Sequence, residues 1–262
     1  VKFISDLEGI PIKSVLRLAE DSVGFYREQD SVADIVSKLF NDEPSEKEFS
    51  YEKISLDDSF VPVFESVGIP AIDRRIIDAR EYLINRGITE EDILSFDIRF
   101  CYDGKYSGRV IVPCIYKGDF VSFVGRDIFG VSDRKYLNPI GNKQSDFLFN
   151  FDSVDSDTVV LTEGVFDAIK INKITQSVAS FGKSLSRRQI SLLDGFKRVI
   201  FYWDKDAYPQ AERYAREIQA ECVTVLHPND MDAGARDVVD SKRLIVESVH
   251  FYSAAYQLFK SE

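Results

Sequence analysis

The stretch Thr158-Val-Val-Leu-Thr-Glu-Gly-Val-Phe-Asp-Ala-Ile-Lys170 decides the fold of this chain. Its first residues form a short apolar run, which predicts a buried β-strand. Glu163 and Gly164 follow, and a glycine permits the sharp backbone turn between a strand and a helix. Apolar residues then recur at helical spacing. The stretch therefore predicts a strand–turn–helix unit with Glu163 at the carboxyl end of the strand, where open α/β sheets bind their ligands.

The order of strand and helix repeats along the rest of the chain. Three more units are expected: strand 177–181 with a helix from 184, strand 198–203 with a helix over 209–220, and strand 223–226 with a helix from about 233. Such alternation indicates βαβ units with right-handed crossovers. We therefore expect the α/β class for this part of the chain, with a Rossmann-like parallel sheet and flanking helices.

Acidic side chains end three of these strands. They are Glu163, then Asp204 and Asp206, then Asp230 and Asp232. An Asp-x-Asp pair places two carboxylates on one side of an extended chain, and parallel order brings the strand ends to one edge. A single such pair is more often a surface turn. Three acidic strand ends in one array predict a site for Mg²⁺ or Mn²⁺ made of all five residues, because hard cations prefer carboxylate oxygens.

The composition excludes other classes of site. The three cysteines and two histidines are scattered without the spacing of zinc ligands, so no zinc site is expected in this chain. No apolar run reaches the roughly 18 residues of a membrane span, and the start lacks the core of a signal peptide. We expect a cytoplasmic protein with no membrane partner. Because the chain begins with Val1, an upstream part is expected to be missing.

Charge is unevenly distributed along the chain. The net charge is −11, which by itself argues against a nucleic-acid partner. Residues 1–73 hold 7 basic and 16 acidic residues, whereas residues 74–143 hold 12 and 10. The middle segment is therefore basic, and bound metal would offset acidic residues further on.

The segment before the βα array has its own pattern. A helix is expected over 72–85, a short second helix after Thr89-Glu-Glu-Asp92, and a β-hairpin with strands 107–116 and 120–128. Helical patterns also cover parts of the first forty residues and 244–259. We divide the chain into an acidic helical region with a linker (1–73), an α+β basic subdomain (74–150), the βα array (151–240) and a helical tail (241–262).

The acidic residues resemble a known signature. Glu163-Gly164 with Asp167, Asp204-Lys-Asp206 and Asp230-Met-Asp232 resemble the Toprim domain of DnaG-type primases, topoisomerases and some nucleases. In that family the glutamate and the Asp-x-Asp pair bind divalent metal at a phosphoryl-transfer centre. The resemblance covers about residues 157–240. It implies a Toprim domain over 151–240 whose catalytic residues are Glu163, Asp204 and Asp206.

Upstream blocks narrow the resemblance. Tyr82–Ile88, Gly108–Pro113, Gly125-Arg126 and Lys135–Asn138 precede the Toprim signature in the order found in the catalytic core of DnaG-type primases. The compact basic segment is most similar to phage primases. In this family the blocks form a basic subdomain that holds template and nucleotides. The residues that the resemblance and the local charge pattern assign to nucleotide or template binding are Arg109, Arg126, Lys135, Asn138, Lys143 and Lys183.

Two of these assignments have alternatives, and one further basic residue of the same region has a different expected role. Lys183 follows Gly182 near a helix start and suits a phosphate contact, but the segment also fits a simple turn before a helix cap. Lys143 is near a basic family position, although the residues after it differ from the family pattern. Arg86 is instead expected to pair with acids of its own helix.

The resemblance implies synthesis of short RNA primers on single-stranded DNA by metal-dependent nucleotidyl transfer. Asp204, Asp206 and Asp230 or Asp232 would hold the metal on the nucleoside triphosphate. Glu163 would bind metal or act in proton transfer at the 3′-hydroxyl. The implied partners are single-stranded DNA, NTPs, the RNA primer product and a replicative helicase in a separate chain. A phage-encoded protein would work in the bacterial host cytoplasm.

Two other functions use the same features. A Toprim nuclease would cleave phosphodiesters with the same acids, and a topoisomerase is less compatible with this length. A catalytically inactive module would only dock on DNA or a helicase. The basic hairpin argues against the nuclease, and acids at all three strand ends argue against the inactive module.

Overall fold

The computed structural model describes residues 49–141, 143–228, 234, 236–251 and 253. The helices expected in the first forty residues are outside this part of the chain. So are Asp230 and Asp232 of the expected metal site, and the end of the expected tail helix.

The first sheet is antiparallel and has five strands in the order β1-β2-β3-β4-β5. The strands are β1 (Phe60–Pro62), β2 (Arg99–Cys101), β3 (Arg109–Tyr116), β4 (Asp119–Asp127) and β5 (Tyr136–Leu137). β3 and β4 are the expected hairpin, which is confirmed. Its two turn residues, Lys117 (φ 53°) and Gly118 (φ 77°), are both left-handed, as tight hairpin turns require.

Two helices adjoin this sheet. Helix α4 (Pro70–Asn85) buries Ile76, Ala79 and Leu83, which recur at helical spacing. Helix α5 (Glu90–Ser95) begins with a capping box in which Thr89 and Asp92 each accept the other's backbone N–H. Both helices were expected from the sequence.

The second sheet has the strand order β10-β9-β8-β6-β7. Its strands are β6 (Thr158–Thr162), β7 (Ser177–Ala179), β8 (Arg198–Tyr202), β9 (Glu221–Thr224) and β10 (Val249–His250). The first four are parallel, which confirms the expected α/β sheet, whereas β10 is antiparallel to β9. The expected tail helix from residue 244 is wrong beyond Val246, where helix α9 (Val238–Val246) ends and β10 follows.

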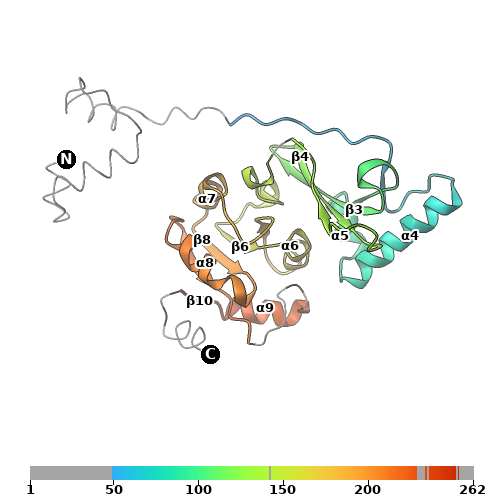
Figure 1. Ribbon diagram of the computed structural model, residues 1–262. Helices are drawn as coiled ribbons and strands as arrows, with labels where there is room; N and C mark the ends of the chain where they lie inside the picture. Colours follow the sequence, from blue (N-terminus) through green and yellow to red (C-terminus); the bar gives the residue numbers. More distant parts are fainter. Residues whose placement is uncertain (1–48, 142, 229–233, 235, 252, 254–262) are drawn as a thin grey trace, which may run out of the picture. The chain divides into compact units, whose positions relative to one another are not determined.

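Helices cover both faces of the parallel sheet (Figure 1). Successive strand residues face opposite sides, so Ile200 and Tyr202 pack in one core with α9, while Phe201 and Trp203 face the other side. Trp203 there meets Tyr214 of helix α8 (Tyr208–Ala215), with ring centroids 6.2 Å apart. Helix α6 (Val165–Ile171) follows β6, and helix α7 (Arg187–Leu193) follows β7.

Helix α6 joins the two sheets. Its residues Val165, Phe166, Ala168 and Ile169 share one buried cluster with α4, α5 and the antiparallel sheet. Just beyond its end, the Lys173 ammonium lies 2.8 Å from the Asp92 carboxylate and donates to the Gly87 carbonyl at 2.8 Å. Because Glu163 lies immediately before α6, it stands where the two sheets meet.

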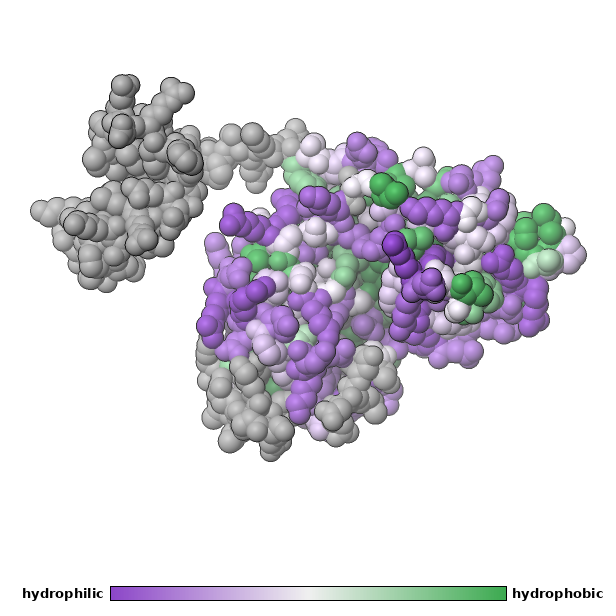
Figure 2. Space-filling view, in the orientation of Figure 1, coloured by the Kyte–Doolittle hydropathy of each residue, from purple (hydrophilic) through white to green (hydrophobic). Residues whose placement is uncertain are grey.

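The surface is mostly polar on the face shown in Figure 2, and apolar residues there form small separate patches. None of the helices built from the described residues has both the length and the apolar character needed to cross a bilayer.

Candidate active site

Three carboxylates converge at the carboxyl ends of β6 and β8. The two strands are parallel with Thr162 opposite Tyr202, so their ends are level. Glu163 follows β6, Asp204 comes two residues after the end of β8, and Asp206 lies in a 3₁₀ turn that leads to α8. One carboxylate oxygen of each residue lies within 4.8 Å of the others. The structure brings together these three of the five acids predicted to form the metal site. The other two, Asp230 and Asp232, are outside the described residues.

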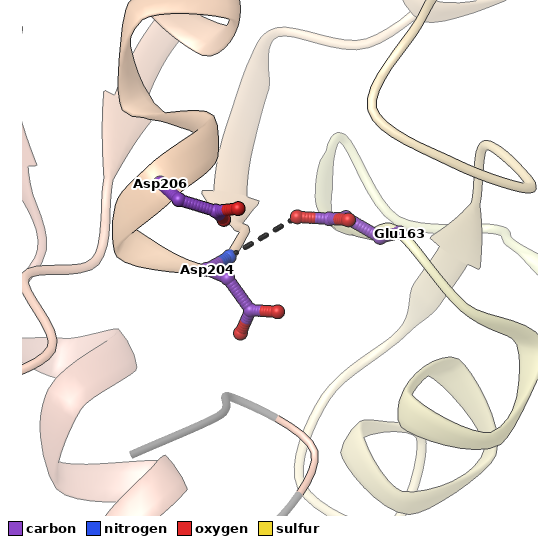
Figure 3. Close-up of side chains that lie close together, drawn as sticks. All are labelled: Glu163, Asp204 and Asp206. Atoms are coloured by element: carbon purple, nitrogen blue, oxygen red, sulfur yellow. Dashed lines mark hydrogen bonds between the residues drawn. The ribbon is translucent and has the colours of Figure 1, made fainter. Parts of the chain in front are cut away.

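Backbone geometry fixes the orientation of the acids (Figure 3). The main-chain N–H of Asp204 donates to Oε1 of Glu163 at 3.2 Å. The carboxylates of Glu163 and Asp206 point toward each other, and that of Asp204 points in another direction. The carboxylate oxygens therefore surround a common space from two strands.

The electrostatics of the cluster favour a cation. Burial, and then the charge of Asp204, raise the pKa of Glu163 to about 7. Lys183 forms an ion pair with Asp206, and this contact raises the pKa of the lysine. Three carboxylates this close repel one another unless a cation lies among them, and hard oxygen donors at this spacing suit Mg²⁺ or Mn²⁺. The donor set fits the expected metal.

A cavity of about 910 Å³ extends from the acids to the antiparallel sheet. Glu163, Asp167 and Asp204 line it from the parallel sheet and α6. The residues that line it from the other side include Arg86, Val124, Arg126, Lys135, Tyr136 and Asn138. Acidic and basic groups from opposite halves of the structure thus face one space.

The basic wall of the cavity is built on β4 and β5. The Arg126 guanidinium lies over the Tyr136 ring at 4.8 Å from its centroid. Close pairing of the two strands requires Gly125, because a Cβ there would lie 2.6 Å from the Leu137 carbonyl oxygen. Lys135 and Tyr136 are exposed. The planar guanidinium of Arg126 and the exposed ammonium of Lys135 suit contacts with phosphate, and the Tyr136 ring suits stacking on a base.

Arg109 has a different place from the one expected. It is only 3% exposed. Its guanidinium donates to the carbonyls of Gly125 (3.2 Å), Arg134 (2.7 Å) and Lys135 (3.3 Å), and to the Ser132 hydroxyl (2.8 Å). These bonds direct both terminal nitrogens of the buried guanidinium into the protein, which contradicts the expected direct contact of Arg109 with nucleotide or template. Arg109 positions the loop that carries Lys135.

Asp127, opposite Arg109 on β4, anchors the other part of this loop. Its carboxylate accepts from the backbone N–H groups of Phe129 (3.0 Å), Gly130 (3.2 Å) and Ser132 (2.8 Å). Burial acts to raise the pKa of Asp127, but these bonds and the charge of Arg109 outweigh burial, and the pKa is lowered. The loop that ends at Lys135 is thus held by two buried charged residues.

Replacing Arg109 by methionine is expected to destabilise the protein by about 2–4 kcal/mol, because buried carbonyls lose their donors and Asp127 loses a nearby positive charge. Urea unfolding followed by circular dichroism measures this. The exposed Lys135→Met in the same loop is the matched control and should change stability by less than about 0.5 kcal/mol. Equal stability of the two variants would contradict the positioning role.

The other residues predicted to bind nucleotide or template differ in their position relative to the cavity. Asn138 lines the cavity and donates to the Gln144 side chain. Lys183 lies beside the acids through its ion pair with Asp206. Lys143 is exposed just before a 3₁₀ turn at Gln144–Asp146 and is not among the described residues that line the cavity.

Arg86 belongs to the cavity, contrary to the expected pairing with acids of α4. Its guanidinium lies over the rings of Tyr82 (5.7 Å) and Phe166 (5.2 Å) and lines the cavity. The described residues include no carboxylate within ion-pair distance of it. Phe166 comes from α6, eighty residues further along the chain, so helix periodicity around Arg86 gives no signal of this contact.

A second missed feature is the contact of α6 with the segment that follows β9. Lys170 donates to the Gly234 carbonyl at 2.5 Å. A Cβ at Gly234 would lie 2.3 Å from Oδ1 of Asp167, so a larger residue there would displace the Asp167 side chain. This contact brings Gly234 and Arg236 to the cavity wall. No motif around these two residues predicts it.

The similar proteins and solved structures named below are primases. No protein-family model matches the chain. The DNA primase of Thermotoga maritima is 30% identical over an alignment that covers 49% of this chain and 31% of that protein. The DNA primase of Synechococcus elongatus is also 30% identical, over 45% of this chain and 19% of that protein. The chain thus spans less than a third of the length of these curated relatives.

The solved structures agree in fold. A DnaG primase catalytic domain bound to single-stranded DNA superposes with a TM-score of 0.61 at 19% identity, covering 77% of this chain and 78% of that one. The zinc-binding and RNA polymerase domains of the Aquifex aeolicus primase give 0.60 at 20% identity, covering 94% and 70%. The chain is thus similar in sequence to DNA primases, and its fold is similar to that of DnaG primase catalytic domains.

Proposed function

We propose that this chain synthesises short RNA primers on single-stranded DNA by metal-dependent nucleotidyl transfer. One observation carries the proposal: Glu163 and Asp204, at the ends of β6 and β8, line the same cavity as Arg126 of β4 and Lys135, which precedes β5. A site that joins a nucleotide to a 3′-hydroxyl needs both groups, because it must hold metal-bound triphosphate and a nucleic-acid strand together.

The acids have the first role. Glu163, Asp204 and Asp206 would hold Mg²⁺ or Mn²⁺, and Asp230 and Asp232 are proposed to complete the site. A bound divalent cation offsets negative charge on the triphosphate and on the transferring phosphoryl group. Lys183, which pairs with Asp206, is placed to exchange that partner for a phosphate oxygen once the acids are neutralised.

The basic wall has the second role. Arg126 offers a planar set of donors that matches phosphate oxygens, and Lys135 adds an exposed charge. Tyr136, 45% exposed and beside Arg126, can stack on a base. Asn138 supports this wall, and Lys143 is proposed to contact template outside the cavity.

The context of the activity is also proposed. The protein would act in the cytoplasm of a bacterial host as a phage primase, with a replicative helicase in a separate chain. Residues 74–150 would be the basic subdomain and residues 151–240 the Toprim domain. The region 1–73 and the tail 241–262 would flank this core.

The proposal is tested with single-stranded DNA, radiolabelled NTPs and Mg²⁺ or Mn²⁺, followed by gel separation of the products. The expected result is labelled oligoribonucleotides that require template and metal and disappear on RNase treatment. Shortening of the DNA without any NTP requirement would instead establish the nuclease. Saturable metal binding without either product would establish an inactive docking module.

A further inference from the structure

Arg236 is a buried cation on the wall of the cavity. It lies between Gly234 and the start of α9, whose N-cap is Asp237. The residue is 7% exposed, and it lines the same cavity as Glu163 and Asp204. A guanidinium stays charged in a protein, and its burial needs a structural or functional reason.

Two neighbours fix the plane of this guanidinium. Nε donates to Nδ1 of the buried His227 at 3.0 Å, and Nη1 donates to a carboxylate oxygen of Asp240 at 2.9 Å. The first bond uses the lone pair of Nδ1, so the imidazole carries its proton on the other nitrogen and is neutral. Asp240 is therefore the charged partner of Arg236.

Asp240 also pairs with a second arginine, so its charge is not available to Arg236 only. Its other carboxylate oxygen accepts from Arg243 at 2.6 Å. One carboxylate is thus shared by two guanidinium groups, and the cluster Arg236–Asp240–Arg243 keeps one positive charge. Arg243 has a 58% exposed side chain, whereas that of Arg236 is 2% exposed. The Arg236 end of the cluster is therefore the buried end, on a cavity wall that Asp167 and Asp237 also line.

The third guanidinium nitrogen of Arg236, Nη2, lacks a hydrogen bond to the described residues. Nη2 is buried and has no hydrogen-bond partner among the residues that the structure describes. A buried donor without an acceptor is costly, most of all on a charged group. Arg236 lines the cavity, so a ligand bound there can supply the acceptor.

We propose that Nη2 of Arg236 binds a phosphate oxygen of the incoming nucleoside triphosphate, an inference that rests on the proposed function. Phosphate is the anion that this cavity would receive, and a guanidinium held by two neighbours presents its remaining donor without ordering cost. Arg236 lies on the same half of the structure as the acids, whereas Arg126 and Lys135 belong to the antiparallel sheet. The phosphate beside Arg236 is therefore the metal-bound triphosphate, not the template backbone.

The test compares Arg236→Gln with the control Lys242→Gln, which removes an exposed cation of α9 that does not line the cavity. Fluorescence anisotropy measures binding of a labelled NTP with Mn²⁺, and separately of a labelled single-stranded oligonucleotide. Arg236→Gln should weaken NTP binding about 10–100-fold, the usual effect of one charged hydrogen bond. It should leave oligonucleotide affinity within about 2-fold, and Lys242→Gln should leave both affinities within about 2-fold.

Unchanged NTP affinity in folded Arg236→Gln would overturn the inference about Arg236 but would leave the proposed function standing. An equal loss for NTP and oligonucleotide would also overturn it, since the residue would then act on the whole fold or on the template. If thermal melting shows that Arg236→Gln is unfolded, Arg236→Lys is assayed instead; it retains the charge and should still lose NTP binding selectively. Failure of the wild type to bind NTP with metal would reject the proposed function itself.

Discussion

Asp204→Asn is expected to reduce primer synthesis at least 100–1000-fold, on the order of the several kcal/mol that a catalytic metal contributes to a transition state. Asparagine has nearly the same shape and keeps the backbone N–H that donates to Glu163. The substitution therefore removes a charged metal ligand with little change in the fold. Product formation at saturating NTP and Mg²⁺ measures the effect.

The control for this substitution is Asp58→Asn, which removes an exposed carboxylate outside the cavity. It should retain wild-type activity. Circular dichroism should give the same spectrum for both variants. If Asp204→Asn kept more than about a tenth of the wild-type rate, the three carboxylates would not form the catalytic metal site.

Glu163→Gln should make the metal-free protein more stable while weakening its binding of Mn²⁺. Burial and Asp204 raise the pKa of Glu163 from its ordinary value of 4.5 to about 7, so its ionised form is unfavourable in the folded state. The full shift corresponds to about 3 kcal/mol. Because the carboxylate is partly exposed, solvent screening reduces the expected gain to about 1–2 kcal/mol at pH 8.

The pH dependence of this gain has a definite sign. The folded-state pKa lies above the unfolded value, so protonation stabilises the wild-type fold. That stabilisation is complete below about pH 4.5 and is lost as the pH rises to about 7. The stability difference between Glu163→Gln and wild type should therefore grow between these pH values and level off above them.

Urea unfolding at several pH values, with EDTA and then with excess Mn²⁺, measures both effects. Mn²⁺ should stabilise the wild type more than the variant, because binding to the native state adds to its stability. Glu65→Gln, at an exposed position, should follow the wild type at every pH. A stability difference independent of pH would contradict the account of Glu163.

The parts of the fold predicted best from the sequence are those with dense local signals. Strands β6 and β8 are apolar runs that end in acids, and Lys117-Gly118 specifies the hairpin turn. In each case neighbours within a few residues determine the structure. The shared edge of Glu163, Asp204 and Asp206 then follows from parallel strand order.

Elements that form by pairing with a distant part of the chain are absent from the sequence-based prediction or are predicted as another type of element. Strand β1, only three residues long, forms by pairing with β2, about forty residues later, and β10 forms by pairing with β9. The apolar spacing after residue 244 fits a helix equally well, so only the tertiary pairing distinguishes the two. Short strands of this kind carry little local information.

The charged residues illustrate the same limit. Arg109 and Arg126 occupy β3 and β4 one register step apart, yet one is buried by backbone acceptors and the other lines the cavity. Sequence pattern cannot separate them, because the acceptors belong to a loop 23–26 residues away. Arg236 likewise reaches the cavity through contacts of Gly234 with Asp167 and Lys170.

Single-nucleotide extension of an RNA primer annealed to single-stranded DNA tests the central claim most directly, because it removes the need for initiation. Two templates that differ only in the next base, dT or dC, are each offered all four labelled NTPs one at a time with Mg²⁺. The account predicts addition of AMP opposite dT and GMP opposite dC by the wild type, and neither by Asp204→Asn. No extension on either template, or cleavage of the DNA without NTP, would contradict it.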